Sequence, residues 1–337
     1  MKILYYTPTY VPNYNAGDTL MAHAIVTYLQ SRGHEVTVMI PKGEPYVYDG
    51  VNVIPRCSGL FNKVDAVFCQ LDTTQETIRL ANCPIFWVMH NTFSYPSIEA
   101  NKHVNVIYNS EAAVNMMGWL NDFFVLPPPV DIDHYNVPRE NAEYVTLINC
   151  NENKGGKILY EIAKRMPDTK FLAVKGSYGT QYLPIPVTDP QYNVTNKAIE
   201  QGLGYLPNVT VIDNMADIRE VYNLTKVLIM PSLYESWGRV ATEAMASGIP
   251  VIAAPTFGLM ENIGINGNFV KREDLNGWIM AINKLKEKKE YDKQSAYSKK
   301  RAIELKPEKN LMGLESFVSK KVSEHRKKRE YGIQQHS

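Results

Sequence analysis

Short runs of β-forming residues alternate with amphipathic segments along most of the chain. Each run is followed by a turn or by a segment with helical periodicity, which is the pattern of βαβ units on a largely parallel sheet. In the first half, the expected strands are residues 2–8, 35–41, 51–55, 65–70, 84–90 and 104–109. Between the first two strands, residues 18–30 have one apolar helical face, and Gly33 follows as a helix stop. The alternation predicts an α/β fold.

A run of three prolines at 127–129 separates this series from a second one. Proline neither continues a helix nor fits a central strand, so the run marks a connection between domains. The second series has expected strands at 144–150, 170–174, 209–213, 227–230 and 251–254, with helices at 156–165 and near 217–224. A chain of 337 residues also exceeds what one hydrophobic core usually serves. We expect a first Rossmann-like domain over 1–133 and a second over 134–309.

Two segments do not follow the alternation. Residues 177–207 are rich in Pro, Tyr, Gly and Asn without a clear period, so we expect an extended loop beside the second sheet. Within the last segment, 310–337, apolar residues recur at near-helical spacing among charged ones, which predicts an amphipathic helix that needs an apolar surface. These residues are Leu311, Leu314, Phe317, Val318 and Val322. A solvated basic tail and a helix on a membrane surface stay open as alternatives.

Composition and charge remove several classes of function. Lys plus Arg number 36 and Asp plus Glu 35, so a formal charge of +1 gives no global electrostatic reason to bind a polyanion. No apolar run approaches the roughly 18 to 20 residues of a membrane span, and residues 1–10 are too short a run for a secretory signal. We expect a cytoplasmic protein, with peripheral membrane contact still open. The four cysteines lie far apart, so no metal site is expected, and the oligomeric state is not predicted.

The segment 231–250 carries the strongest chemical signal. An expected buried strand leads into a loop with Glu235 and Gly238, and a helix of small residues then runs until Gly248 and Pro250. A helix N-terminus offers free N–H groups and a positive dipole end to phosphate, and glycine lets a ligand approach the backbone. Carboxylates accept hydrogen bonds from sugar hydroxyls. Two glutamates alone are more often solvated, but this combination favours a ligand site.

Glu235 and Glu243, with seven residues between them, stand in E-S-W-G-R-V-A-T-E-A-M-A-S-G-I-P-V-I-A, which resembles the paired-glutamate signature of retaining glycosyltransferase family 4. Residues 15–18 resemble the glycine-rich first loop of that family, His90 follows a strand where the family often has histidine, and Lys154 stands where it has a basic phosphate-binding turn. The resemblance implies the GT-B fold. Such a fold has two Rossmann-like domains with parallel sheets facing across a cleft, and a C-terminal helix that crosses back to the first domain.

The resemblance also implies roles for individual residues. Glu235 would contact the donor sugar, Lys154 would neutralise the leaving diphosphate, and His90 would contact the acceptor or the sugar. Asp18 would meet the acceptor hydroxyl, although capping its helix is the more ordinary role. The implied donor-binding residues are Gly17, Asn149, Lys175, Trp237, Gly238, Arg239 and Glu243, with Glu243 on the ribose hydroxyls.

One position departs from the family pattern. The family commonly has arginine five residues before the lysine, and this chain has Asn149, which brings hydrogen bonds but no charge. Lys175 and Arg239 are the candidate replacements for that charge. For both residues, an ordinary solvated charge at the protein surface is the alternative interpretation.

The implied function is metal-independent, retaining transfer of a sugar from a nucleotide-sugar, either a UDP-hexose or a GDP-sugar, to an acceptor hydroxyl. The nucleotide-sugar is a co-substrate and no cofactor is expected. A glycan or lipid-linked acceptor is favoured over nucleic acid. The alternatives are a GT-B epimerase or phosphorylase, glycosylation of modified DNA bases, and a non-catalytic nucleotide-sugar-binding relative. A dinucleotide oxidoreductase ranks low because no G-x-G-x-x-G follows a strand.

Overall fold

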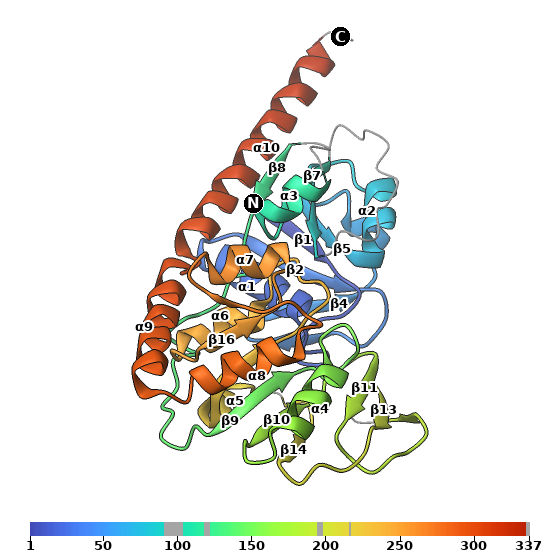
Figure 1. Ribbon diagram of the computed structural model, residues 1–337. Coiled ribbons are helices and arrows are strands. Elements are labelled where there is room, and N and C mark those ends of the chain that lie inside the picture. Colours follow the sequence, from blue (N-terminus) through green and yellow to red (C-terminus); the bar gives the residue numbers. More distant parts are fainter. Residues whose placement is uncertain (91–103, 118–121, 194–197, 216, 335–337) are drawn as a thin grey trace. The chain divides into compact units, whose positions relative to one another are not determined.

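The computed structural model describes residues 1–90, 104–117, 122–193, 198–215 and 217–334 (Figure 1). The chain divides into two compact units. Unit 1 combines residues 1–129 with the end of the chain from Pro307, and unit 2 is Val130–Lys306. The chain therefore passes from unit 1 to unit 2 directly after the proline run at 127–129.

Unit 1 is built on a sheet of eight described strands in the order β3-β4-β2-β1-β5-β6-β7-β8. Every neighbouring pair is parallel except β3 and β4. The strands are β1 (Lys2–Tyr6), β2 (Glu35–Ile40), β3 (Tyr46–Tyr48), β4 (Val51–Pro55), β5 (Ala66–Gln70), β6 (Ile85–Met89), β7 (Val104–Tyr108) and β8 (Phe123–Val125). Helices α1 (Gly17–Ser31), α2 (Thr74–Leu80), α3 (Glu111–Met117) and α10 (Glu308–Gln334), with short 3₁₀ turns at Ser58–Leu60 and Leu71–Thr73, complete the unit.

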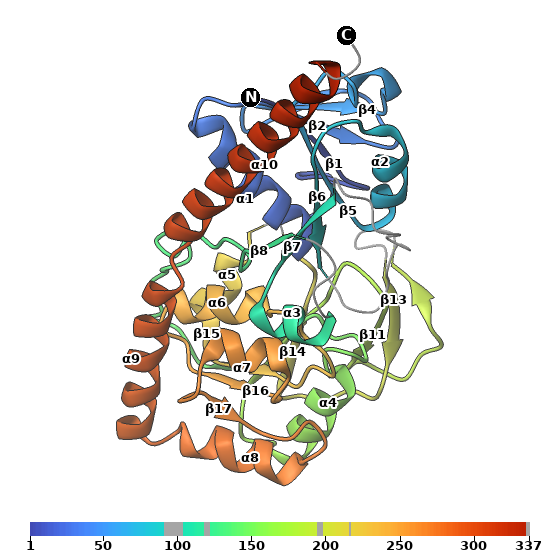
Figure 2. The same ribbon diagram turned by 90° about the horizontal axis from the view of Figure 1, so that it is seen from above.

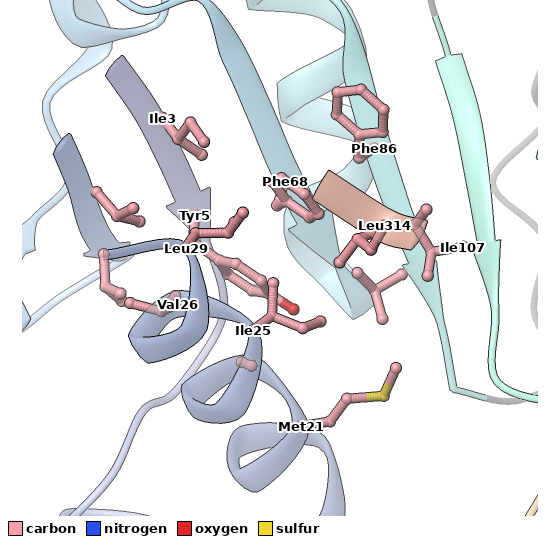
Figure 3. Packing of buried hydrophobic residues seen from close by; sticks show 14 of the residues in the cluster. Ile3, Tyr5, Met21, Ile25, Val26, Leu29, Phe68, Phe86, Ile107 and Leu314 are labelled. Carbon is pink, nitrogen blue, oxygen red and sulfur yellow. The ribbon is translucent and has the colours of Figure 1, made fainter. Parts of the chain in front are cut away.

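The central strands of unit 1 are apolar on both faces, as expected where helices cover a parallel sheet. The Tyr5 and Phe68 rings stack at 5.6 Å between centroids, and Met21 of α1 belongs to the same cluster of buried residues. Figure 3 shows Leu314 of α10 among the buried side chains of this core, together with Phe68, Phe86 and Ile107. The last helix is therefore part of the hydrophobic core of unit 1.

Helix α10 contributes four buried apolar side chains to that core. It runs alongside α1 (Figure 2), where Glu315 accepts hydrogen bonds from Tyr28 and from Arg32. The four buried residues are Leu311, Leu314, Val318 and Val322. The expected return of the C-terminal helix to the first domain is confirmed. Within the described residues, no helix has both the length and the apolar character that crossing a membrane requires.

Unit 2 contains a sheet of six described strands, all parallel, in the order β14-β10-β9-β15-β16-β17. The strands are β9 (Tyr144–Ile148), β10 (Phe171–Val174), β14 (Val209–Ile212), β15 (Thr225–Met230), β16 (Val251–Ala253) and β17 (Asn268–Phe269). The helices are α4 (Gly156–Arg165), α5 (Arg219–Leu224), α6 (Arg239–Ala246), α7 (Phe257–Ile263), α8 (Leu275–Lys284) and α9 (Lys288–Glu304). The predicted α/β architecture with parallel sheets is confirmed in both units.

The prediction of an extended loop at 177–207 is wrong. The described part of this segment forms a small sheet from β11 (Thr180–Leu183), β12 (Gln191–Tyr192) and β13 (Ile199–Gly202). One of its buried positions is the polar Gln181, whose amide is satisfied by the backbone N–H of Gly176 and the carbonyl of Tyr178. A polar residue in a buried strand position breaks the apolar alternation by which strands are recognised.

Candidate functional site

The loop between β15 and α6 holds both glutamates of the motif in a constrained backbone. Gly238 is the N-cap of α6 and has a φ of 82°, in the left-handed region that glycine adopts without strain. A Cβ atom at this position would also lie 2.5 Å from Cδ2 of Leu259. Both backbone conformation and packing therefore require glycine where the helix begins.

Asn262 on α7 fixes the direction of the peptide groups in this loop. Its fully buried side-chain amide donates to the carbonyls of Trp237 (3.1 Å) and Gly238 (3.0 Å). In a trans peptide the C=O and N–H point in opposite directions. The N–H groups of Gly238 and Arg239 therefore point away from Asn262, at the positive end of α6, which is the arrangement that binds anions. Sequence reasoning missed Asn262 because no motif marks it.

The Trp237 side chain is buried, with 3% of its surface exposed. Its indole N–H donates to the Thr242 hydroxyl at 3.3 Å, and Thr242 in turn donates to Asn262. The ring therefore stabilises the start of α6. The part of Trp237 that a ligand would meet is its backbone, as predicted for the amides of this loop, and that contact stays a prediction.

Lys154 and Glu235 lie 81 positions apart in the sequence and are in direct contact. Lys154 Nζ is 2.5 Å from Glu235 Oε1, and the Ser232 hydroxyl donates to the same oxygen at 2.9 Å. The two side chains are 23% and 10% exposed. Burial alone would lower the pKa of Lys154, but the charge and the hydrogen bond of Glu235, with contributions from Tyr178 and Tyr234, together outweigh burial, so the pKa is raised. Lys154 therefore carries a positive charge at neutral pH.

The turn that carries Lys154 packs directly on the loop that carries Glu235. Gly155 has a φ of 99°, and a Cβ atom there would lie 2.4 Å from Cγ of Pro231. The N–H of Leu233 donates to the carbonyl of Asn153 at 2.7 Å. These contacts follow from the sheet, because β9 and β15 are neighbouring parallel strands whose carboxyl ends lie at one edge.

Glu243 is buried in a cluster of polar side chains. Arg239 Nε donates to Glu243 Oε1 at 2.6 Å, and the Tyr222 hydroxyl donates to Oε2 at 2.7 Å. Burial, followed by the charge of Glu243, raises the pKa of Tyr222 well above its usual value. Each carboxylate oxygen has a second lone pair, so these partners do not exhaust its capacity. The Glu243 carboxylate therefore already binds Arg239 and Tyr222 within the protein, and its contact with ribose stays a prediction.

Both candidate replacements for the missing arginine are paired with carboxylates. Lys175 Nζ lies 3.0 Å from Glu200 and 2.9 Å from Asp213, and Arg239 is paired with Glu243. A contact of either one with a donor stays a prediction.

Asn149, the position that departs from the family pattern, has a φ of 69°, a left-handed conformation that asparagine tolerates better than most residues. Its side-chain oxygen accepts from Gln181 at 3.1 Å and from the N–H of Asn151 at 3.3 Å. The residue thus shapes the backbone before the Lys154 turn, and its contact with a donor stays a prediction.

In unit 1, a chain of hydrogen bonds sets the tautomer of His90. The Thr7 hydroxyl donates to the carbonyl of Thr9 (2.9 Å) and therefore accepts from Nε2 of Gln70 (2.9 Å). The side-chain oxygen of Gln70 then faces the Tyr5 hydroxyl (2.8 Å) and Nε2 of His90 (2.9 Å). Since that oxygen only accepts, Nε2 of His90 carries a hydrogen.

The charge state of His90 depends on burial and on Asp18. Burial lowers the pKa of His90, and the negative charge of Asp18 acts in the opposite direction. The net shift is downward, so the imidazole is neutral at neutral pH. The charge of Asp18 therefore acts on His90, although the two residues lie far apart in the sequence.

Asp18 does not cap helix α1. The N-cap residue is Ala16, and its N–H donates to the Thr19 hydroxyl at 3.1 Å. The capping role that we expected for Asp18 is therefore wrong, because Thr19 reaches back to the cap instead. Asp18 lies in the first turn, where a negative charge is favourable to the helix dipole. Among the residues that the structure describes, no neighbouring atom lies within 4 Å of a Cβ built on Gly17, so packing against them does not require glycine there.

Comparison with known proteins adds family and fold to this geometry. Residues 132–302 match the family model "Glycosyl transferases group 1". D-inositol 3-phosphate glycosyltransferase of Mycobacterium sp. (strain KMS) is 32% identical over 136 residues, which are 39% of this chain and 29% of that protein. The "Uncharacterized glycosyltransferase MJ1607" of Methanocaldococcus jannaschii is 42% identical over 65 residues, which are 18% of this chain and 17% of that protein. The chain thus matches less than a third of the length of these curated relatives.

Solved structures match almost the whole chain. Sucrose-phosphate synthase from Thermosynechococcus elongatus has a TM-score of 0.73 at 15% identity, and the match covers 95% of this chain and 99% of that one. Anabaena HepE in complex with UDP and glucose has a TM-score of 0.70 at 17% identity, with 95% and 99% covered. At such low identities the likeness shows the fold alone, which is the expected GT-B fold.

Proposed function

The chain belongs to the glycosyl transferases of group 1, and from that premise we propose that it is a retaining, metal-independent hexosyltransferase that uses a nucleotide-sugar. The observation that carries the proposal is the contact of Lys154 with Glu235 beside the N-terminus of α6. A positive side chain and outward-pointing amides suit a diphosphate, and a carboxylate suits sugar hydroxyls. The two kinds of group that a nucleotide-sugar requires therefore meet in one place.

In the proposed reaction, an acceptor hydroxyl attacks the anomeric carbon on the face that the diphosphate leaves. The bond from the anomeric carbon to the phosphate oxygen breaks, and the proton of the acceptor passes to the departing phosphate. Negative charge grows on the diphosphate at this point, so Lys154 Nζ and the amides of Gly238 and Arg239 stabilise the transition state more than the ground state. Glu235 orients the sugar. His90 contacts the acceptor or the sugar, and Asp18 meets the acceptor hydroxyl.

For the donor we propose a UDP-hexose, with a GDP-sugar as the second choice. Anabaena HepE, which shares the fold, has been solved with UDP-glucose, and this supports uridine. Glu243 would accept hydrogen bonds from the ribose hydroxyls. For the acceptor we propose a hydroxyl of a glycan or of a lipid-linked sugar, since a net charge of +1 does not favour nucleic acid.

The first test is turnover in the presence of EDTA. With a panel of UDP- and GDP-hexoses and of glycan, lipid-linked and modified-DNA acceptors, we expect one donor to give a product whose new bond keeps the anomeric configuration of the donor. NMR of the product reads that configuration. Lys154 and the α6 amides carry the phosphate charge, so EDTA is expected to leave the rate unchanged within about twofold, well below the tenfold that 1.4 kcal/mol of lost stabilisation would cost.

Several outcomes would contradict the proposal. Loss of activity in EDTA with recovery in Mg²⁺ or Mn²⁺ would exclude the metal-independent mechanism, and an inverted product would exclude retention. Conversion of the nucleotide-sugar without an acceptor would indicate an epimerase, and dependence on free phosphate would indicate a phosphorylase. Nucleotide binding with no turnover at all would indicate a non-catalytic relative.

Glu243→Gln is expected to weaken UDP binding and to destabilise unit 2 as well. The loss of a charge-assisted hydrogen bond to ribose costs about 1 to 3 kcal/mol of binding free energy. The same change leaves the buried guanidinium of Arg239 without its carboxylate, which lowers the free energy of unfolding. Calorimetric titration with UDP and thermal melting measure the two effects separately.

Two further variants separate these roles of Glu243. Tyr222→Phe removes the hydrogen bond that the Tyr222 hydroxyl donates to Glu243, but the Glu243 carboxylate keeps its negative charge. The affinity for UDP should therefore change little. Glu220→Gln changes an exposed glutamate of α5 and serves as the matched control. If Glu243→Gln melts at a lower temperature but binds UDP as the wild type does, Glu243 is a structural residue and the ribose assignment is wrong.

A further inference from the structure

Arg272 lies between β17 and α8 and joins the two segments that carry Lys154 and Glu235. Its Nε donates to the carbonyl of Pro231 at 3.0 Å, and its Nη2 donates to the carbonyl of Glu152 at 2.7 Å. Pro231 begins the loop that leads to Glu235, and Glu152 lies in the turn that leads to Lys154. One guanidinium group thus bonds to the backbone of both segments.

The backbone of Arg272 is itself anchored in the core of unit 2. The indole N–H of Trp278, a fully buried residue of α8, donates to the carbonyls of Lys271 and Arg272 at 3.2 Å each. The Arg272 side chain is 19% exposed. Its contact with the carboxylate of Glu273 is 3.8 Å long, and Glu273 is 76% exposed, so this ion pair contributes little. Arg272 therefore acts mainly on the two backbone carbonyls.

The guanidinium group suits this task because it is planar and presents its N–H donors in a fixed fork. Two carbonyls that bind one edge of the fork are held at a fixed separation. The bond from the Leu233 N–H to the Asn153 carbonyl joins the same two segments at a second point. Two such links fix both distance and angle between the segments.

We propose that Arg272 is a positioning residue that sets the distance between the ammonium of Lys154 and the carboxylate of Glu235. The inference rests on the proposed function, in which these two groups act on the diphosphate and on the sugar of one donor. Displacing either group by about 1 Å costs on the order of 100-fold in rate, because catalysis depends on near-attack geometry. Arg272 itself need not touch the substrate.

A second explanation for Arg272 is that its positive charge compensates for Asn149. The variant Arg272→Lys separates the two, since lysine keeps the charge and loses the planar fork. Arg272→Gln loses both. Arg139→Lys is the matched control, because Arg139 is also a guanidinium that joins two segments of unit 2, through the Tyr291 hydroxyl (2.8 Å) and the Gly248 carbonyl (3.2 Å). Neither partner belongs to the Lys154 turn or to the Glu235 loop.

We expect both Arg272 variants to lower kcat by about 10- to 100-fold, with the Kd for UDP changed by less than about threefold. Arg139→Lys is expected to keep the kcat of the wild type. Its melting temperature is expected to be similar to that of the Arg272 variants. A readout without turnover is acetylation of Lys154 by sulfo-NHS-acetate, followed by peptide mass spectrometry. If Lys154 is released from its contact with Glu235, the rate of Lys154 acetylation should rise several-fold. We expect this rise in both Arg272 variants and not in Arg139→Lys.

The outcomes are distinguishable. If Arg272→Lys has wild-type kcat and wild-type Lys154 acetylation, charge alone suffices and the positioning role is wrong. If Arg139→Lys shows the same changes as the Arg272 variants, the effect is general loss of structure and the proposal also fails. If the wild type turns over no donor but Lys154 acetylation depends on Arg272 as expected, the positioning of Lys154 stands and the proposed function fails.

Discussion

Changing Lys154 to methionine is expected to lower kcat by about 10²- to 10³-fold, the range found when one preorganised group that stabilises growing negative charge is removed. Methionine keeps most of the side-chain volume and removes the charge. The affinity for UDP should fall less than kcat does, because the charge on the diphosphate grows as the glycosidic bond breaks. Steady-state kinetics with the identified donor and calorimetric titration with UDP measure these two quantities.

The matched control is Lys157→Met. Lys157 also lies near this turn, but it pairs with Glu152 and half of its side chain is exposed. We expect its kcat to stay within about twofold of the wild type, since exposed ion pairs contribute little. Equal losses in the two variants, or an unchanged kcat in Lys154→Met, would show that Lys154 is not the cation that stabilises the leaving group.

The sequence predicted the meeting of Lys154 and Glu235 only through the family resemblance. Each residue follows an apolar strand, and local pattern shows that both side chains lie near carboxyl ends of parallel strands. Local pattern does not show that β9 and β15 are neighbours, because strand order is set by packing across the whole sheet. The order β14-β10-β9-β15-β16-β17 supplies the missing step.

The residues that sequence reasoning missed share one property. Asn262, Arg272 and Gln70 are single polar residues outside any motif, and each acts by donating to groups far away in the sequence. Arg272 reaches carbonyls 41 and 120 positions earlier. The partners of Asn262 and Arg272 are backbone carbonyls, which every residue possesses, and the partner of Gln70 is the hydroxyl of a threonine outside any motif. No periodicity or spacing rule encodes such contacts.

The error at Asp18 has a different origin. Asp18 and Thr19 both stand near the start of α1, and both residue types cap helices. Which of the two binds the N-cap depends on the residue at which the backbone first becomes helical. Helix α1 begins at Gly17, one residue before the expected start at Asp18. Helix ends are uncertain by one or two residues, which is enough to assign the wrong cap.

Ending the chain at Lys306 is expected to unfold unit 1. The cut removes α10 and with it Leu311, Leu314, Val318 and Val322 from the core. Burial of one such side chain contributes about 1.5 to 3 kcal/mol, so four contribute roughly 6 to 12 kcal/mol, which is comparable to the whole stability of a typical domain. Ion pairs of Lys321 with Asp122 and of Arg326 with Asp65 are also lost, but they lie at the surface and add little.

The expected result is a truncated chain without turnover, in which the melting transition of unit 1 is missing while unit 2 still binds UDP. Calorimetry and UDP titration measure this. Because a truncated chain can simply aggregate, Leu314→Ala provides a milder variant, with an expected loss of about 2 to 5 kcal/mol in the free energy of unfolding. Met312→Ala, at an exposed position of the same helix, is its control.

The membrane alternative for the same helix makes an opposite prediction. Lys327 and Lys328 are exposed near its end, so changing both to glutamate should leave melting and turnover unchanged if the helix serves the core of unit 1. On a membrane-binding helix, the double change would abolish flotation with vesicles of anionic lipid while leaving stability intact. A truncated protein that melts and turns over as the wild type does would contradict the structural role, because four buried side chains cannot leave a core without cost.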